Sequence, residues 1–79
     1  MNVRVLFFGA TADEVGERQL ELSLDESPTV RDAFKETLKS FPNLEKHKLL
    51  FAVNQEYVSE NRKLRNGDEL AIFTQVSGG

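Results

Sequence analysis

The chain has 79 residues, a length that suits one small domain. Its 10 Lys and Arg against 13 Asp and Glu give a formal net charge of −3, the wrong sign for a protein that binds nucleic acid through its phosphates. With no cysteine, the chain forms no disulfide, thiolate nucleophile or cysteine-based metal site. The apolar start MNVRVLFFG is too short to cross a membrane and lacks a secretory signal pattern, so we expect a cytoplasmic protein without membrane contact.

The first predicted element is a strand over residues 2–8. Val3, Val5 and Phe7 fall on one face of it, and Leu6 and Phe8 fall on the other. Large apolar groups on both faces indicate a central strand, or a strand with one face kept for a partner.

A hairpin with a long connection is predicted next. Residues 10–16 (ATADEVG) predict a loop or a short helical turn closed by a glycine. In RQLELSL the leucines at 20, 22 and 24 alternate with polar residues, which predicts a second strand with the leucines inward.

The segment SPTVRDAFKETLKSFP predicts the only long helix, because its apolar residues recur with a period near 3.6. Thr29 precedes Asp32 by three residues, the spacing of a capping box. Pro42 disfavours helical geometry at Phe41 and predicts the end. The inward stripe consists of Val30, Ala33, Phe34, Thr37 and Leu38.

Three short strands are predicted in the last part of the chain. KLLFAVNQEYVS is apolar over residues 49–53, breaks at 54–56 and resumes at 57–58, which indicates two strands around a tight turn. Asn66 and Gly67 both tolerate left-handed geometry and predict a turn before a last strand over residues 69–74. In that strand Leu70 and Ile72 face one way, and Ala71 and Phe73 face the other.

This order of elements, two strands, a helix and three short strands, resembles ubiquitin-like β-grasp folds. One amphipathic helix covers one face of a sheet, so we expect an α+β fold with a mixed β-sheet and one main helix packed across one face. The resemblance implies that the first and last strands are parallel neighbours in the centre of the sheet. We expect residues 1–74 to form this domain and residues 75–79 to form a flexible C-terminal tail.

No active site of its own is predicted for the chain. His47 is the single histidine, and without a partner ligand it indicates a solvated loop residue rather than a metal site. The carboxylates of DEVGE and LDES indicate surface groups, and the glycines fit no phosphate-binding loop. We therefore expect no bound cofactor and no metal.

Four apolar side chains fall on the sheet face opposite the helix: Leu6, Phe8, Ala71 and Phe73. Two interpretations of this face are open. The connection at residues 10–16 partly covers it, or the face is uncovered and forms a contiguous apolar patch, the kind of surface that marks a protein interface.

The sequence ends in VSGG, after the predicted last strand. Residues 75–79 span roughly 17 Å when extended, enough to reach into a partner. Gly78 and Gly79 have no β-carbon and suit a narrow slot. The α-carboxyl group of Gly79 is ionised at neutral pH and a poor electrophile, so chemistry at that carbon requires activation by another protein.

Together the segments VRVLFFG, PTV, LLFAVNQEYVS, LRNGDELAIF and VSGG resemble, over essentially the whole chain, the small sulfur-carrier subunit of molybdopterin synthase, the MoaD family. The resemblance implies a non-catalytic sulfur donor. It further implies that an E1-like adenylyltransferase consumes ATP to adenylate the last glycine, Gly79, which is then converted to a thiocarboxylate. By the same resemblance, we expect the tail to insert into the large catalytic subunit, in a heterotetramer, and to give its sulfur to a cyclic pyranopterin precursor of molybdopterin.

The resemblance also implies roles for single residues. Gly78 threads the tail, Val76 and Ser77 belong to the segment that reaches the partner, and Phe8 and Phe73 match aromatic docking positions. Thr74 and Gln75 stand where family members commonly have prolines. Because proline fixes φ, their absence predicts a more mobile tail.

Three alternatives stay open at this stage. In the first, the chain is a sulfur carrier for another product, such as the thiazole of thiamine or a thiolated tRNA base, although thiazole carriers tend to lack the ATADEVG connection. It is a ubiquitin-like modifier joined to lysines through Gly79. Or it is a β-grasp interaction module with an idle tail.

Overall fold

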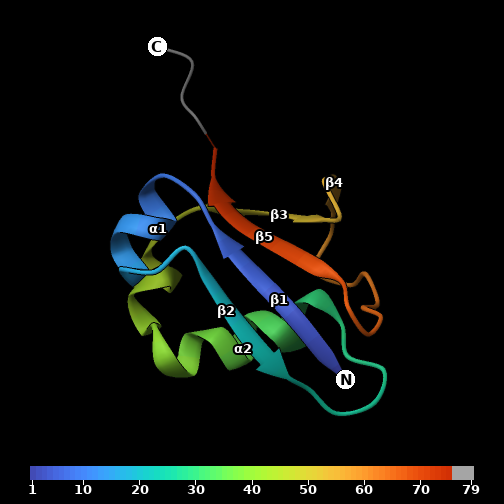
Figure 1. The fold of residues 1–79 in the computed structure, drawn as a ribbon. Helices are drawn as coiled ribbons and strands as arrows, with labels where there is room; N and C mark the ends of the chain where they lie inside the picture. Colours follow the sequence, from blue (N-terminus) through green and yellow to red (C-terminus); the bar gives the residue numbers. More distant parts are fainter. Residues whose placement is uncertain (76–79) are drawn as a thin grey trace.

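The computed structural model describes residues 1–75, which form a five-stranded mixed sheet in the order β2-β1-β5-β3-β4 (Figure 1). The first and last strands are parallel neighbours, and the other pairs are antiparallel. This arrangement confirms the expected α+β β-grasp fold. The elements in chain order are β1 (Asn2–Phe7), α1 (Ala10–Val15), β2 (Gln19–Ser23), α2 (Val30–Ser40), the 3-10 helix η1 (Pro42–Lys46), β3 (Leu49–Val53), β4 (Glu56–Val58) and β5 (Glu69–Thr74).

The main helix α2 begins and ends where the sequence predicts. Thr29 Oγ1 accepts from the N–H of Asp32 at 3.3 Å, and a carboxylate oxygen of Asp32 accepts from the N–H of Thr29 at 2.8 Å. This capping box satisfies two amides that the helix itself leaves unpaired. At the other end Phe41 leaves helical geometry directly before Pro42, as expected.

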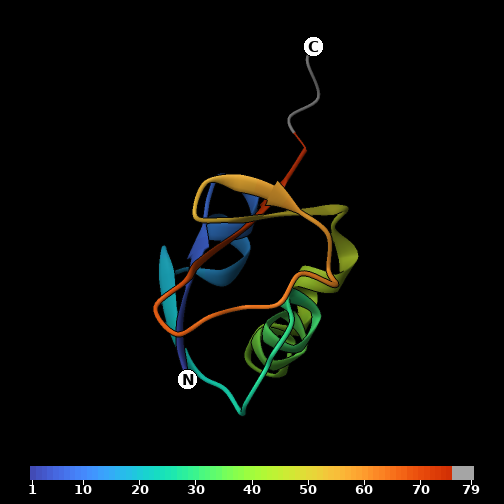
Figure 2. The same cartoon turned by 90° about the vertical axis from the view of Figure 1, so that its right-hand side faces the viewer.

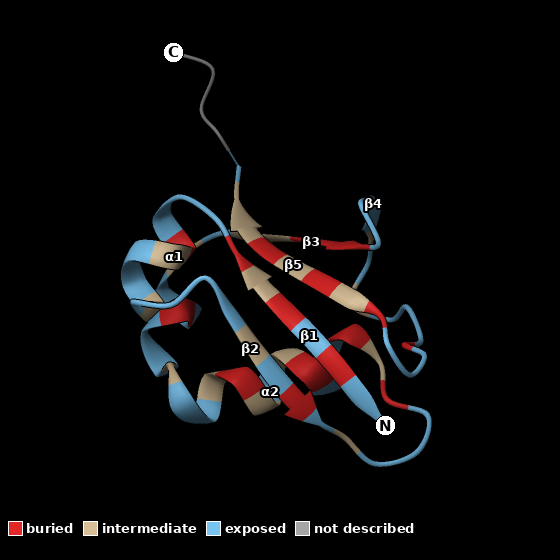
Figure 3. Cartoon of the chain, viewed as in Figure 1, coloured by how far each residue is buried: buried red, intermediate tan, exposed pale blue. Residues whose placement is uncertain are grey.

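Helix α2 covers one face of the sheet, as the side view in Figure 2 shows. The core lies between α2 and the sheet. Buried and exposed positions alternate along β1 (Figure 3). Val3, Val5 and Phe7 are buried, and Arg4 is exposed. The ring of Phe34 on α2 meets that of Phe51 on β3 edge to face, with centroids 5.3 Å apart. Within residues 1–75, no helix is long and apolar enough to span a membrane.

Two short helices complete the core. Of the two alternatives for residues 10–16, the helical one is correct: Ala10–Val15 form α1, and Gly16, with a φ of 78°, is its C-cap. The polar connection after α2 contains η1, which the sequence pattern did not predict, and Leu44 in η1 is fully buried. One leucine among polar residues has no periodicity to detect, so only the tertiary fold reveals that this segment closes one end of the core.

The two tight turns differ in detail from expectation. Asn54 and Gln55 both have left-handed φ, 49° and 72°, and form a two-residue hairpin turn between β3 and β4. At the second turn only Gly67 has positive φ, 88°, so the expectation was wrong for Asn66. The side chain of Asn66 instead ties this turn to the start of β1, since its Oδ1 accepts a hydrogen bond from the N–H of Asn2 at 2.8 Å.

Candidate docking surface

The sheet face opposite α2 carries an open groove of about 500 Å³. All four predicted apolar residues, Leu6, Phe8, Ala71 and Phe73, line it, and it extends to Thr74 at the end of β5. Phe8 is 53% exposed, so much of its ring is open to solvent. The structure therefore brings together the residues that sequence alternation placed on this face.

Helix α1 leaves the groove open. Ala12 and Val15 of α1 pack against the core, and Thr11 is buried, so the inner side of α1 faces away from the groove. Only Gly9 and Ala10, at the start of the connection, reach the rim. Of residues 10–16 only Ala10 lines the groove, so the structure favours the exposed patch over partial coverage by this connection.

Three further residues belong to the same face, because residues directly opposite in neighbouring strands point the same way. Leu50 pairs with Phe73, Ala52 pairs with Ala71, and Tyr57 in turn pairs with Ala52. Sequence reasoning missed Leu50 and Ala52, since LLFAV is apolar throughout and shows no alternation. It missed Tyr57 because the face of that residue depends on how β4 pairs with β3. We call the full set the apolar face: Leu6, Phe8, Leu50, Ala52, Tyr57, Ala71 and Phe73.

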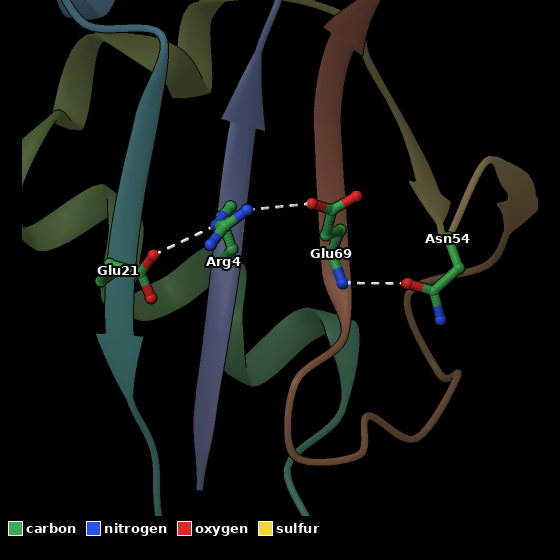
Figure 4. Close-up of polar contacts among 4 residues, drawn as sticks. All are labelled: Arg4, Glu21, Asn54 and Glu69. Carbon is green, nitrogen blue, oxygen red and sulfur yellow. Dashed lines mark hydrogen bonds and ion pairs between the residues drawn. The ribbon is translucent and has the colours of Figure 1, made fainter.

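At its other end the same side of the sheet is polar. Arg4 lies between two carboxylates, with Nε 3.2 Å from Glu21 Oε1 and one terminal nitrogen 3.2 Å from Glu69 Oε2 (Figure 4). The hydrogen bond that Arg4 donates to Glu21, and then the negative charge of Glu21 and of Glu69, raise the pKa of the Arg4 guanidinium. Asn54 Oδ1 accepts from the N–H of Glu69 at 3.0 Å and ties the β3–β4 turn to the start of β5. The polar network thus marks one boundary of the apolar face.

His47 differs from its expected role as a solvated loop residue. It follows η1 directly, its side chain is 31% exposed, and its Nε2 lies 3.0 Å from Glu14 Oε1. The contact joins η1 to α1 rather than contributing to the apolar face.

The predicted tail residues Val76, Ser77, Gly78 and Gly79 lie outside the described residues, so their roles stay predictions. The structure does describe their point of attachment. Strand β5 ends at Thr74, which lines the groove, and Gln75 after it is exposed. The chain therefore leaves the sheet beside Phe73, at the apolar end of the open face.

A mixed five-stranded sheet with one main helix across one face, and parallel first and last strands, defines a β-grasp protein. The model of the ThiS family matches residues 5–79, so the chain belongs to the ThiS family. This confirms the family resemblance stated from the sequence.

Among curated relatives, the chain is 39% identical to the molybdopterin synthase sulfur carrier subunit of Escherichia coli, covering 98% of this chain and 99% of that protein. It is 37% identical to the subunit of the same name from Haemophilus influenzae, with the same coverage of 98% and 99%. Among solved structures, SAMP1 from Haloferax volcanii superposes with a TM-score of 0.90 at 27% identity and 100% coverage of both chains.

Proposed function

We propose that this protein is the sulfur carrier subunit of a molybdopterin synthase, acting in the cytoplasm. The observation that carries the proposal is its end-to-end similarity to carriers of that name, which covers 98% of this chain in the E. coli comparison. The family match extends through residue 79, so it includes the terminal glycines. The carrier performs no catalysis alone, because its reactive group is a carboxylate that other proteins activate.

The proposed chemistry takes place at Gly79. Its carboxylate attacks the α-phosphorus of ATP on an E1-like activating enzyme, and pyrophosphate leaves, which produces a glycyl adenylate. A sulfide-level donor then attacks the acyl carbon and AMP leaves, so that the product is a thiocarboxylate. Glycine at the last two positions suits this path, since a residue without a β-carbon passes a slot that others block.

The apolar face gives the proposed docking surface for the large catalytic subunit and for the activating enzyme. The groove that it lines extends to Thr74, where β5 ends, so a partner bound there lies beside the point at which the tail begins. Residues 75–79, including Val76 and Ser77, then span roughly 17 Å toward the partner's active site. A heterotetramer of two carriers and two large subunits is part of this proposal.

The test follows the carboxylate by intact mass. The chain is incubated with its cognate activating enzyme, ATP and a sulfide donor, and then with the large subunit and the pyranopterin precursor. We expect the mass gain of one oxygen replaced by sulfur, lost again when the precursor is converted. A chain lacking Gly79 is the matched control and gains no sulfur. A wild-type chain that never acquires sulfur would contradict the proposal.

A second candidate, a ubiquitin-like modifier, is favoured by the similarity to SAMP1, a small archaeal modifier protein. Both functions begin with an adenylated Gly79 and differ in what attacks the acyl carbon. The modifier reaction gives an isopeptide to a lysine, visible as larger conjugates in the same incubation with cell extract. Thiocarboxylate without conjugates favours the carrier. Co-purification with a pterin-processing subunit, rather than a tRNA thiolase or a thiazole-forming enzyme, separates the molybdopterin carrier from carriers for other products.

A further inference from the structure

Thr11 in α1 is a fully buried polar residue that connects the ends of two strands. Its Oγ1 accepts a hydrogen bond from the N–H of Phe8 at 3.1 Å and donates to the carbonyl of Ile72 at 2.7 Å. The N–H of Thr11 donates to the carbonyl of Phe8 at 3.2 Å, and Oγ1 lies 3.0 Å from that same oxygen. One residue thus binds both backbone polar groups of Phe8 and a carbonyl of β5.

The hydroxyl occupies the point where the β1–β5 ladder stops. The last paired residues are Phe7 and Ile72. In a parallel ladder, the next N–H of one strand can bond a carbonyl of its neighbour directly. Here the Thr11 hydroxyl stands between the N–H of Phe8 and the carbonyl of Ile72, so a side chain joins the strands where backbone pairing ends.

This position matters because of the neighbouring side chains. Phe8 lines the groove of the apolar face and is 53% exposed. Phe73, which directly follows Ile72, lines the same groove. The hydroxyl therefore lies between the backbone segments that carry the two phenylalanines.

We propose that Thr11 is a positioning residue for docking: its hydroxyl sets the spacing of Phe8 and Phe73 across the groove, and hence the surface that the large subunit binds. The identity of the partner rests on the proposed function. The positioning itself is a property of the isolated chain and is measured without any partner.

The chain offers a matched control in Thr37 of α2. Thr37 is also fully buried, and its Oγ1 donates at 2.9 Å to the carbonyl of Ala33 within its own helix. Thr37→Val removes a buried hydroxyl as Thr11→Val does, but leaves the ends of β1 and β5 untouched. Thr11→Ser keeps the hydroxyl and loses only a methyl group, so it tests rescue.

The experiment compares these three variants with the wild type. In the isolated full chain, amide exchange at Phe8 and the ring-proton shifts of Phe8 and Phe73 report positioning. Calorimetric titration with the large subunit reports affinity. We expect Thr11→Val to speed Phe8 exchange and to raise the dissociation constant, each by about tenfold, the change that corresponds to a lost hydrogen bond. Thr11→Ser and Thr37→Val should keep wild-type affinity.

Wild-type affinity in Thr11→Val, or an equal loss in Thr37→Val, overturns the proposal, since the second result would reflect general destabilisation. If the wild type itself does not bind the large subunit, the proposed function fails. Phe8 exchange then still decides the inference, and an unchanged rate in Thr11→Val overturns it. Should Thr11→Val not fold, Thr11→Ala leaves the same two backbone groups without the hydroxyl and takes its place.

Discussion

The rings of Tyr57 and Phe73 lie 5.8 Å apart, centroid to centroid, at an interplanar angle of 54°. Tyr57 is 77% exposed, so this aromatic pair extends the apolar face toward solvent on the β4 side. Exposed aromatic residues around a groove are typical of the few side chains that contribute most of the binding energy at an interface.

We therefore predict that Phe73→Arg weakens binding to the large subunit. The variant would bury an unpaired charge against an apolar partner, and removing such an anchor costs about 2 kcal/mol or more, which corresponds to over tenfold in dissociation constant. Titration calorimetry measures the affinity. Ser40→Arg places the same charge on the exposed end of α2 and serves as control. Equal affinity of the two variants would show that the apolar face does not dock.

One residue added after Gly79 should abolish sulfur transfer and leave the fold intact. The added residue moves the carboxylate away from the position that adenylation requires, and a side chain there would block a glycine-sized slot. Thiocarboxylate formation is measured by intact mass, and folding by circular dichroism. A chain with one residue added before Met1 is the control. Full precursor conversion by the C-terminally extended chain would falsify the assignment of Gly79.

The capping box predicts a pH dependence of stability. Hydrogen bonds from the backbone N–H and then the hydroxyl of Thr29 lower the pKa of Asp32 below its ordinary value of 3.8. Because the folded-state pKa is the lower one, the stabilisation is present above pH 3.8 and is lost as the pH falls through the folded-state value. Asp32→Asn should reduce stability at neutral pH and remove this part of the acid dependence.

Urea unfolding at neutral pH and well below pH 3.8 measures this effect. Asp25→Asn removes an exposed carboxylate ahead of the helix and is the matched control. Thr29→Ala, which removes the other half of the box, should cost about 1 kcal/mol. If Asp32→Asn and Asp25→Asn show the same acid dependence, the capping box does not couple stability to pH.

Leu44→Ala should destabilise the fold by about 2 to 5 kcal/mol, the cost of a cavity left by a fully buried leucine. Leu44 is 0% exposed, although it lies in a segment that is otherwise polar. Chemical denaturation gives the free energy of unfolding. Leu50→Ala, on the half-buried apolar face, should cost clearly less. Similar losses would indicate that η1 is not an anchored part of the core.

Local patterns were sufficient to predict most of the fold. Alternation identified β1 and β5, and the capping box with Pro42 gave both ends of α2, because each signal lies within a few neighbouring residues. Leu44 could not be found in this way. Its burial depends on where η1 packs, which a short polar segment does not encode locally.

The sequence predicted only the part of the candidate docking surface that local alternation encodes. Leu6, Phe8, Ala71 and Phe73 follow from alternation along single strands. Tyr57 joins them only through the register of β4 on β3, and the bridge from Thr11 to Ile72 spans 61 positions in the chain. Contacts of this kind depend on strand pairing across the whole fold.

The parallel pairing of β1 with β5 has a consequence for synthesis of the protein. Residues 2–7 leave the ribosome well before their neighbours at 69–74. Until β5 is made, β1 has an unpaired edge, and Leu6 and Phe8 have no Ala71 and Phe73 beside them. The surface proposed for docking can form only after β5 has been translated, so nascent chains lacking β5 cannot present it to the proposed partner.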